Sequence, residues 1–195
     1  MDKRRNEIVR VIAGKFGRRK LKGPGLLPLR PTSDRLRETL FNILAPAVED
    51  SLFIDLYAGT GAIGIEALSR GARQVILVES NAKAARLVRE NLAALEVRTG
   101  VELIEADALT GLERVAGRRL VADFIFLDPP YAKTPEHASV LEYLDASHLI
   151  APRGLVIVEH HWRVELPERL DRLECTREIE QGESMLSFYQ LAAAA

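Results

Sequence analysis

Cysteine is almost absent from the sequence: Cys175 is the only one among 195 residues, beside four histidines. A lone cysteine excludes an internal disulfide framework and any zinc site built on several cysteines, and we expect no metal. Nowhere does the chain approach the roughly 18 consecutive apolar residues of a membrane-spanning helix, and its first residues lack the apolar core of a signal peptide. These absences predict a protein of the cytoplasm that does not enter a membrane.

Net charge is also low, at −1 overall, but the charges are unevenly placed along the chain. Residues 1–37 hold twelve lysines or arginines against three acids, which gives this segment +9 and leaves −10 for the remainder. A basic segment joined to an acidic remainder favours an extended polyanionic partner over nonspecific binding to many partners. The alternative is that these charges form only a solvated surface.

Within this basic segment, two short stretches have the pattern of a β-ribbon. Residues 9–14 and 17–21 alternate apolar and basic side chains around glycines, as two paired strands with one cationic face do. An isolated ribbon is only marginally stable, so we expect it either to pack on the rest of the protein or to become ordered on its partner. We accordingly divide the chain into a basic hairpin arm (1–30), a main domain (31–191) and a short tail (192–195).

A capped helix opens the main domain, because Thr32, Ser33 and Asp34 are all cap residues and an apolar stripe follows them at helical spacing. From Ser51 onward, short apolar strands alternate with helices, which predicts an α/β fold with a doubly wound parallel sheet. After Pro167 a hairpin replaces this alternation and predicts a final antiparallel pair. The strands are predicted at 52–56, 75–79, 101–105, 123–127, 154–159, 172–179 and 184–191, and the helices at 62–70, 82–94, 108–115 and 136–147.

The stretch Asp128-Pro129-Pro130-Tyr131 follows the fourth of these strands. Prolines lack the amide hydrogen that a strand needs, so the chain must turn out of the sheet at its carboxyl end, where ligands bind in open α/β folds. The turn leaves the Pro129 carbonyl outside the sheet beside the Asp128 carboxylate, with the Tyr131 ring close by. Two hydrogen-bond acceptors and a ring suit a flat substrate that carries an NH2 group, although the same residues taken alone also fit a simple strand-ending turn.

A glycine-rich turn follows the first strand of the alternation. Gly59, Gly61 and Gly64 form a GxGxxG pattern, and Glu79 lies at the end of the next strand. This spacing is typical of nucleotide sites, in which glycines let the ligand approach the backbone and the acid binds ribose hydroxyls. Asp55 at the tip of the first strand would repel a pyrophosphate and attract an ammonium group, which favours S-adenosylmethionine over NAD.

Acids thus follow four successive strands, at Asp55, Glu79, Asp107 and Asp128. Asp107 is placed to accept a hydrogen bond from an adenine amino group. The alternative for Asp107 is that it only caps the helix that follows it. Four acids in succession along one edge of a sheet are harder to explain as caps alone.

The order of these motifs resembles that of the class I S-adenosylmethionine-dependent methyltransferases: D-x-Y-x-G-T-G, then Glu79, Asp107 and D-P-P-Y, then a terminal hairpin. Residues 10–14 (RVIAG) and 30–42 (RPTSDRLRETLFN) resemble more narrowly the RsmD family, the 16S rRNA guanine-N2 methyltransferases of bacteria. This resemblance implies a Rossmann-like, seven-stranded mixed sheet of order 3-2-1-4-5-7-6, with the last strand antiparallel. It also implies helices on both faces of the sheet and an N-terminal basic β-hairpin extension.

By the same resemblance, the protein is a monomeric enzyme that transfers a methyl group from S-adenosylmethionine to the N2 amine of one guanine in 16S rRNA, within an assembling 30S particle. The cofactor-binding residues that it implies are Asp55, Tyr57, Gly59, Gly61, Glu79, Asp107 and Ala108. The implied catalytic residues are Asp128, Pro129, Pro130 and Tyr131. The RNA-binding residues expected on this basis are Arg10, Lys15, Arg18, Arg19, Lys20, Arg30, Arg35 and Arg37.

Other functions explain parts of the sequence. An adenine-N6 methyltransferase would use the same Asp-Pro-Pro-Tyr chemistry but usually has a larger target-recognition region, and a protein-glutamine methyltransferase usually has Asn in place of Asp128. An NAD-dependent oxidoreductase explains the glycine turn but gives Asp55 and Asp128 no role. A non-catalytic RNA-binding protein explains only the arm.

The segment His160-His161-Trp162 follows the fifth predicted strand. No acid or cysteine stands at metal-ligand spacing from the histidines, so we expect them to be surface residues. Trp162 is expected to pack against the protein or, if exposed, to contact RNA.

Overall fold

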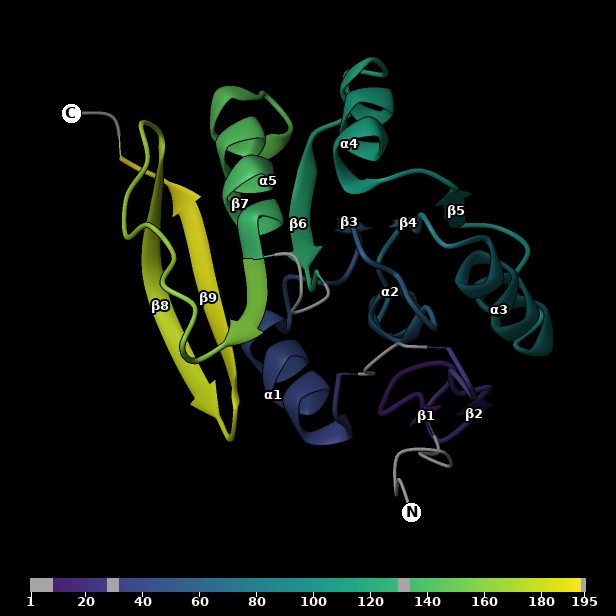
Figure 1. Ribbon diagram of the computed structural model, residues 1–195. Coiled ribbons are helices and arrows are strands. Elements are labelled where there is room, and N and C mark those ends of the chain that lie inside the picture. Colours follow the sequence, from purple (N-terminus) through teal and green to yellow (C-terminus); the bar gives the residue numbers. More distant parts are fainter. Residues whose placement is uncertain (1–8, 28–31, 130–133, 194–195) are drawn as a thin grey trace.

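The computed structural model describes residues 9–27, 32–129 and 134–193, and its centre is a seven-stranded sheet (Figure 1). The strand order is β5-β4-β3-β6-β7-β9-β8, with parallel pairing from β5 to β7 and antiparallel pairing of β9 with both β7 and β8. Counted from β3, this is the predicted order 3-2-1-4-5-7-6, so the predicted fold is confirmed. The bounds are β3 (Leu52–Asp55), β4 (Gln74–Val78), β5 (Val101–Ile104), β6 (Ala122–Leu127), β7 (Ile150–His161), β8 (Leu173–Gln181) and β9 (Ser184–Leu191).

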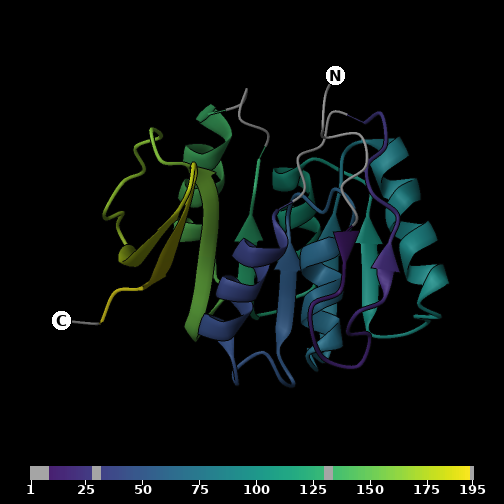
Figure 2. The same cartoon turned by 90° about the horizontal axis from the view of Figure 1, so that it is seen from below.

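Helices cover both faces of this sheet (Figures 1 and 2). Successive residues of a strand point to opposite faces, so Phe53 packs in the core cluster of one face and Ile54 in that of the other. Both faces are apolar because neither is open to water. Within the described residues, no helix combines the length and the apolar character that a membrane crossing requires. The helices are α1 (Asp34–Leu44), α2 (Ala62–Ser69) and α3 (Ala82–Ala94) on one face, and α4 (Ala108–Ala116) and α5 (Thr134–Ala146) on the other.

The described part of the basic arm, residues 9–27, packs on the face that carries α1, α2 and α3 (Figure 2). Its apolar side chains belong to the same core cluster as those helices; they are Val9, Val11, Phe16 and Leu21. The arm is therefore docked on the protein, which is one of the two arrangements expected of a marginal ribbon. Whether residues 1–30 also act as a separate functional unit stays a prediction.

The ribbon itself is shorter than predicted. β1 (Val9–Arg10) and β2 (Lys20–Leu21) form only two residue pairs. The Val11 amide still donates to the Arg19 carbonyl oxygen across the ribbon, but the two amides after it, those of Ile12 and Ala13, donate instead to the buried Glu66 carboxylate of α2, at 2.6 and 3.1 Å. Hydrogen bonds to a residue 53 and 54 positions away thus replace further backbone pairing between the two strands of the arm. The periodicity of the sequence does not predict them.

The turn of the arm lies at the carboxyl end of α2. The amide of Lys15 donates to the Ser69 carbonyl oxygen at 2.7 Å, and the amide of Phe16 donates to the Ser69 hydroxyl at 2.9 Å. Gly14 makes this approach possible, because its φ is +77° and a Cβ there would stand 1.9 Å from the Ser69 carbonyl oxygen. Since α2 begins at the glycine turn, its eight residues place the arm's turn roughly 12 Å away from the candidate cofactor site.

Candidate active site

The strand order gathers the predicted acids at one edge of the sheet. Asp55 ends β3, and Glu79 and Asp128 directly follow β4 and β6. These three strands are parallel neighbours, so their carboxyl ends meet at the same edge. Asp107 follows β5, one strand further out. This edge is also where the glycine turn between β3 and α2 lies.

Gly59 and Gly61 shape that turn, and their φ values of +56° and +81° lie in the left-handed region that favours glycine. A Cβ on Gly59 would meet only the Tyr57 carbonyl oxygen, at 3.8 Å, so a ligand can approach the backbone there. Gly64 has a different role, because a Cβ there would stand 2.2 Å from the Leu77 side chain. The third glycine of the motif therefore allows close packing of α2 on the sheet.

Asp55 is buried beneath the turn, with 1% of its surface exposed. Its two carboxylate oxygens accept long hydrogen bonds from the amides of Tyr57 (3.4 Å) and Gly64 (3.3 Å). Burial raises the pKa of Asp55 to about 7, the two amides oppose this rise, and nearby Glu79 adds to it. Among the described residues, no cationic side chain contributes to this pKa shift. The site therefore fits a ligand that brings its own positive charge.

Glu79 holds the glycine turn in shape. It is buried, and its carboxylate accepts one hydrogen bond from the Gly59 amide (2.8 Å) and one from the Asn81 amide (2.7 Å). These contacts join the turn to the start of α3. Each carboxylate oxygen retains a second lone pair, so the same side chain can still accept hydrogen bonds from ribose hydroxyls.

Asn91 of α3 supports the glycine turn through hydrogen bonds, although no sequence motif marks it as a functional residue. It is fully buried, and its Nδ2 group donates to the carbonyl oxygens of Thr60 (2.9 Å) and Lys22 (3.2 Å). Its Oδ1 atom accepts from the Lys22 amide at 2.7 Å. One amide side chain thus joins the residue between the two loop glycines to the basic arm.

Asp107 caps the amino end of α4, which is the alternative to a contact with adenine that the sequence left open. Its carboxylate accepts from the amide (2.9 Å) and the hydroxyl (2.8 Å) of Thr110, and these bonds lower the pKa of Asp107. The side chain is exposed at the site edge, so capping does not exclude a contact with adenine. Ala108, buried, begins the same helix. Tyr57 is half-buried, and burial, followed by the charge and hydrogen bond of Glu136, raises its pKa.

Asp128 and Pro129 stand at the end of β6, where the predicted substrate site begins. Asp128 is half-buried and Pro129 is buried. Pro130 and Tyr131, the other two residues of the predicted catalytic motif, lie outside the described residues. The pairing of Leu127 with Val158 places Asp128 level with Glu159 on the neighbouring strand.

Glu159 is a fifth acid at this edge that the sequence analysis missed. It is buried, and its carboxylate accepts hydrogen bonds from the hydroxyls of Thr32 (2.8 Å) and Ser184 (3.2 Å). The signal was present, since Glu159 is the last residue of the apolar strand predicted at 154–159. Its contacts tie the segment before α1 to the strand beside Asp128.

The expectation of a surface histidine is wrong for His160, which is only 3% exposed. Its Nε2 atom lies 2.8 Å from the Ser187 hydroxyl of β9, and its Nδ1 atom lies 3.1 Å from the His161 carbonyl oxygen. The reason is that β7 continues to His161 by pairing with β9, which carries the histidine inside. Burial lowers the pKa of His160. Among the described residues, no group of three or more His, Cys, Asp or Glu side chains is arranged to hold a metal ion.

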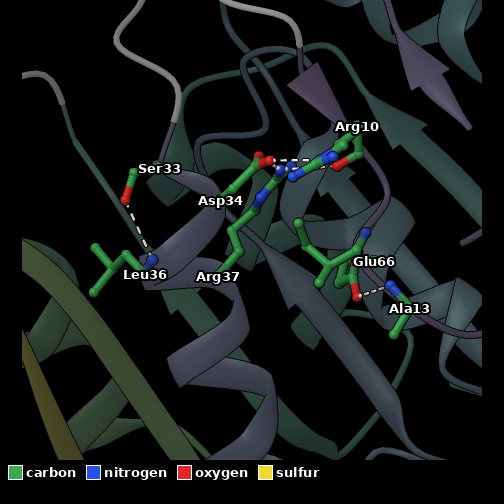
Figure 3. A network of polar contacts seen from close by, with 8 residues as sticks. Arg10, Ala13, Ser33, Asp34, Leu36, Arg37 and Glu66 are labelled. Carbon is green, nitrogen blue, oxygen red and sulfur yellow. Dashed lines mark hydrogen bonds and ion pairs between the residues drawn. The ribbon is translucent and has the colours of Figure 1, made fainter. Parts of the chain in front are cut away.

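Arg37 was expected at an RNA-binding surface, and the structure contradicts that placement. Its side chain is fully buried, and its Nη2 atom donates to the Arg10 carbonyl oxygen (2.8 Å) and to Asp34 (2.5 Å) (Figure 3). The guanidinium of Arg10 donates to the same carboxylate at 2.8 Å. Arg37 therefore fixes the arm to the start of α1 and is not available to a phosphate.

The other predicted RNA-binding residues are exposed or lie outside the described part of the chain. Arg19 donates to the Ala94 carbonyl oxygen at 2.5 Å, Arg35 is exposed on α1, and Arg30 is not among the described residues. Three exposed side chains form no ion pair with any described residue, and we call them the arm cations: Lys15, Arg18 and Lys20. They remain available to a polyanion.

Comparisons with known proteins agree with this geometry. The family model described as Conserved hypothetical protein 95 matches residues 9–190. YlbH of Bacillus subtilis is 36% identical over 182 residues, which are 93% of this chain and 98% of YlbH. Ribosomal RNA small subunit methyltransferase D of Escherichia coli is 33% identical over 185 residues, 95% of this chain and 91% of that protein. The solved structure of Escherichia coli yhhF superposes with a TM-score of 0.81 at 30% identity, over 96% of this chain and 99% of that one. The chain therefore belongs to this family, the RsmD family, and has its methyltransferase fold.

Proposed function

We propose that the protein transfers a methyl group from S-adenosylmethionine to the exocyclic N2 amine of a guanine in 16S rRNA. The observation that carries this proposal is the juxtaposition of Asp128 and the Pro129 turn with the buried Asp55 and the glycine turn, at the carboxyl ends of adjacent strands. Membership of a family that includes a ribosomal RNA small subunit methyltransferase supports the choice of rRNA.

The cofactor class follows from Asp55. Its carboxylate accepts from the Gly64 amide in the first turn of α2, which is where a dinucleotide would place its pyrophosphate. A buried carboxylate there excludes a second anion, but it stabilises the ammonium group of an amino-acid ligand. S-adenosylmethionine has this ammonium and no phosphate. In this arrangement Glu79 accepts from the ribose hydroxyls and Asp107 from the adenine amino group.

S-adenosylmethionine supplies an electrophilic methyl group, so the protein has mainly to orient the nitrogen that attacks it, which can contribute about 7 to 11 kcal/mol. The lone pair of a guanine N2 is delocalised into the ring and is a poor nucleophile. Hydrogen bonds from its NH2 group to the Asp128 carboxylate and the Pro129 carbonyl oxygen favour a pyramidal nitrogen and stabilise the positive charge that develops there. Asp128 then accepts the proton that the nitrogen loses.

A target guanine that is paired must first leave its RNA helix, because its N2 amine is engaged in the base pair and cannot reach the site from within the duplex. Tyr131 stacks on that base in this proposal. The arm cations bind the RNA backbone at a distance from the chemistry, since the turn of the arm lies at the far end of α2. RNA that reaches both places runs along the face that carries α1 and α2.

The test separates chemistry from cofactor binding. Asp128→Ala removes both the acceptor and the proton site, and we expect methyl transfer to fall at least about 100-fold, whereas calorimetric affinity for S-adenosylhomocysteine stays near that of the wild type. Asp128→Asn keeps an acceptor oxygen and should lose less activity than Asp128→Ala. The exposed Asp171, replaced by Ala, is the matched control. Equal losses of activity and of cofactor affinity in Asp128→Ala would show that Asp128 is structural.

A further inference from the structure

Strand β7 extends beyond the end of its neighbour β6 at the substrate edge. The last residue of β6, Leu127, pairs with Val158, and β7 continues for three more residues, to His161. Pairing with β9 supports this extension. At about 3.3 Å per residue, β7 reaches roughly 10 Å past the level of Leu127, the last residue of β6. The residue that follows, Trp162, therefore stands on the rim of the edge that carries the proposed target site.

Trp162 is exposed there, although an indole ring gains free energy by burial. Its surface is 49% exposed, and the other large hydrophobic side chains exposed to this degree among the described residues are Leu26 and Val121. The His161 ring stacks against it, with centroids 5.7 Å apart and an interplanar angle of 27°. The guanidinium carbon of Arg163 lies 4.8 Å from the indole centroid.

The backbone under these side chains is held in place. The Trp162 amide donates to the Glu183 carbonyl oxygen in the β8–β9 turn at 3.1 Å, and the Val164 amide donates to the His161 carbonyl oxygen at 2.8 Å. The residue before them, His160, is buried against β9. An aromatic ring that is fixed in this way loses little conformational freedom when a ligand stacks on it.

We propose that His161, Trp162 and Arg163 form a stacking platform for an unpaired RNA base next to the target nucleotide. The inference rests on the proposed function, because a guanine that leaves its helix exposes the faces of its neighbours at the rim of the site. Aromatic rings and arginine are the groups on which proteins stack unpaired bases. The Arg163 guanidinium also neutralises a phosphate of the same nucleotide.

The sequence supplies a direct probe, because Trp162 is the only tryptophan in the chain. Stacking of a base on the indole ring quenches its fluorescence. We therefore expect the intrinsic fluorescence of the full chain to fall in a saturable manner during titration with single-stranded fragments of 16S rRNA. Fluorescence that is unchanged while anisotropy of a labelled fragment reports binding would overturn the platform.

Variants test whether the stacking contributes to affinity. Trp162→Ala should weaken binding of the labelled RNA by about 5- to 150-fold, the effect of losing one stacked base. It should raise the KM for RNA while the kcat at saturating RNA and the affinity for S-adenosylhomocysteine stay unchanged. Trp162→Phe should recover most of the loss because a ring remains. Val121→Ala removes an equally exposed apolar side chain immediately before β6, at the opposite edge of the sheet, and should change neither the affinity for RNA nor the KM.

The outcomes distinguish this inference from the proposed function. If Trp162→Ala binds and methylates RNA as the wild type does, the platform is wrong and the proposed function stands. If the wild type neither binds nor methylates RNA, both are wrong. If the loss in Trp162→Ala is accompanied by an equal loss of thermal stability that Trp162→Phe does not recover, Trp162 is a packing residue.

Discussion

The affinity for S-adenosylmethionine should depend on pH through Asp55. Burial raises the pKa of this carboxyl to about 7 in the free protein. The ammonium group of the ligand favours the ionised form, so it lowers the pKa in the complex. Binding therefore releases a proton from every molecule whose free Asp55 is still protonated, which is most of them below pH 7 and half of them at pH 7. Affinity rises with pH up to about pH 7 and levels off about one pH unit above it.

The magnitude follows from the fraction of Asp55 that is already ionised. With a pKa of about 7, that fraction is roughly one tenth at pH 6 and one half at pH 7. Affinity should thus increase about fivefold between pH 6 and pH 7. Both pH values lie below the pKa of roughly 7.7 to 8.0 of an α-amino group, so most of the ligand keeps its positive charge.

Isothermal titration calorimetry with S-adenosylhomocysteine measures this linkage directly. Titrations at one pH in two buffers of different ionisation enthalpy give the number of protons released, which should be about 0.9 at pH 6 and about 0.5 at pH 7. Asp55→Asn cannot titrate, so it should bind more weakly and with no dependence on pH over this interval. Equal affinity at the two pH values, with no proton release, would refute the assignment of Asp55 to the ammonium group.

Three further predictions concern the arm and its attachment. Gly14→Ala should lower the free energy of unfolding in urea by about 1 to 3 kcal/mol, because the added Cβ meets the Ser69 carbonyl oxygen. Gly25→Ala is the control: its added Cβ meets no atom within 4 Å, so it should lower the free energy of unfolding by less. Equal losses in the two variants would show that the contact with Ser69 does not matter. Asn91→Ala should cost about 1 to 3 kcal/mol of stability by leaving buried partners unpaired. Asn91→Ala should also weaken S-adenosylhomocysteine binding, because the glycine turn loses the hydrogen bond to the Thr60 carbonyl oxygen. An unchanged affinity would show that the glycine turn keeps its shape without Asn91. Charge reversal of all three arm cations should weaken RNA binding and reduce the slope of log affinity against log salt by about 2 to 3 units; an unchanged slope would remove the arm from the interface.

The order of strands and helices was predictable because both rest on local patterns. Buried parallel strands are apolar runs, and acids at their ends, such as Asp55 and Asp128, mark the edge that binds ligands. The same logic applies to Glu159, the last residue of the strand predicted at 154–159.

The rest depended on contacts between distant parts of the chain. An arginine is expected at the surface because its side chain is charged. Arg37 is buried because the arm covers it, with Arg10, 27 positions earlier, accepting its hydrogen bond. His160 lies inside because β7 and β9 pair further than their apolar residues extend. Asn91 acquires its role from Lys22 and Thr60, which approach it from two other elements. None of these contacts leaves a periodic trace in the sequence.

The most direct test of the central claim is mass spectrometry of nucleosides from small-subunit rRNA after incubation with the protein and S-adenosylmethionine. The rRNA should come from cells that lack the protein, both as naked 16S rRNA and as 30S particles. We expect N2-methylguanosine at one position per rRNA molecule in at least one of these substrates, and none with Asp128→Ala. Methylated adenosine in its place, or no new methylated nucleoside in either substrate, would contradict the proposed function.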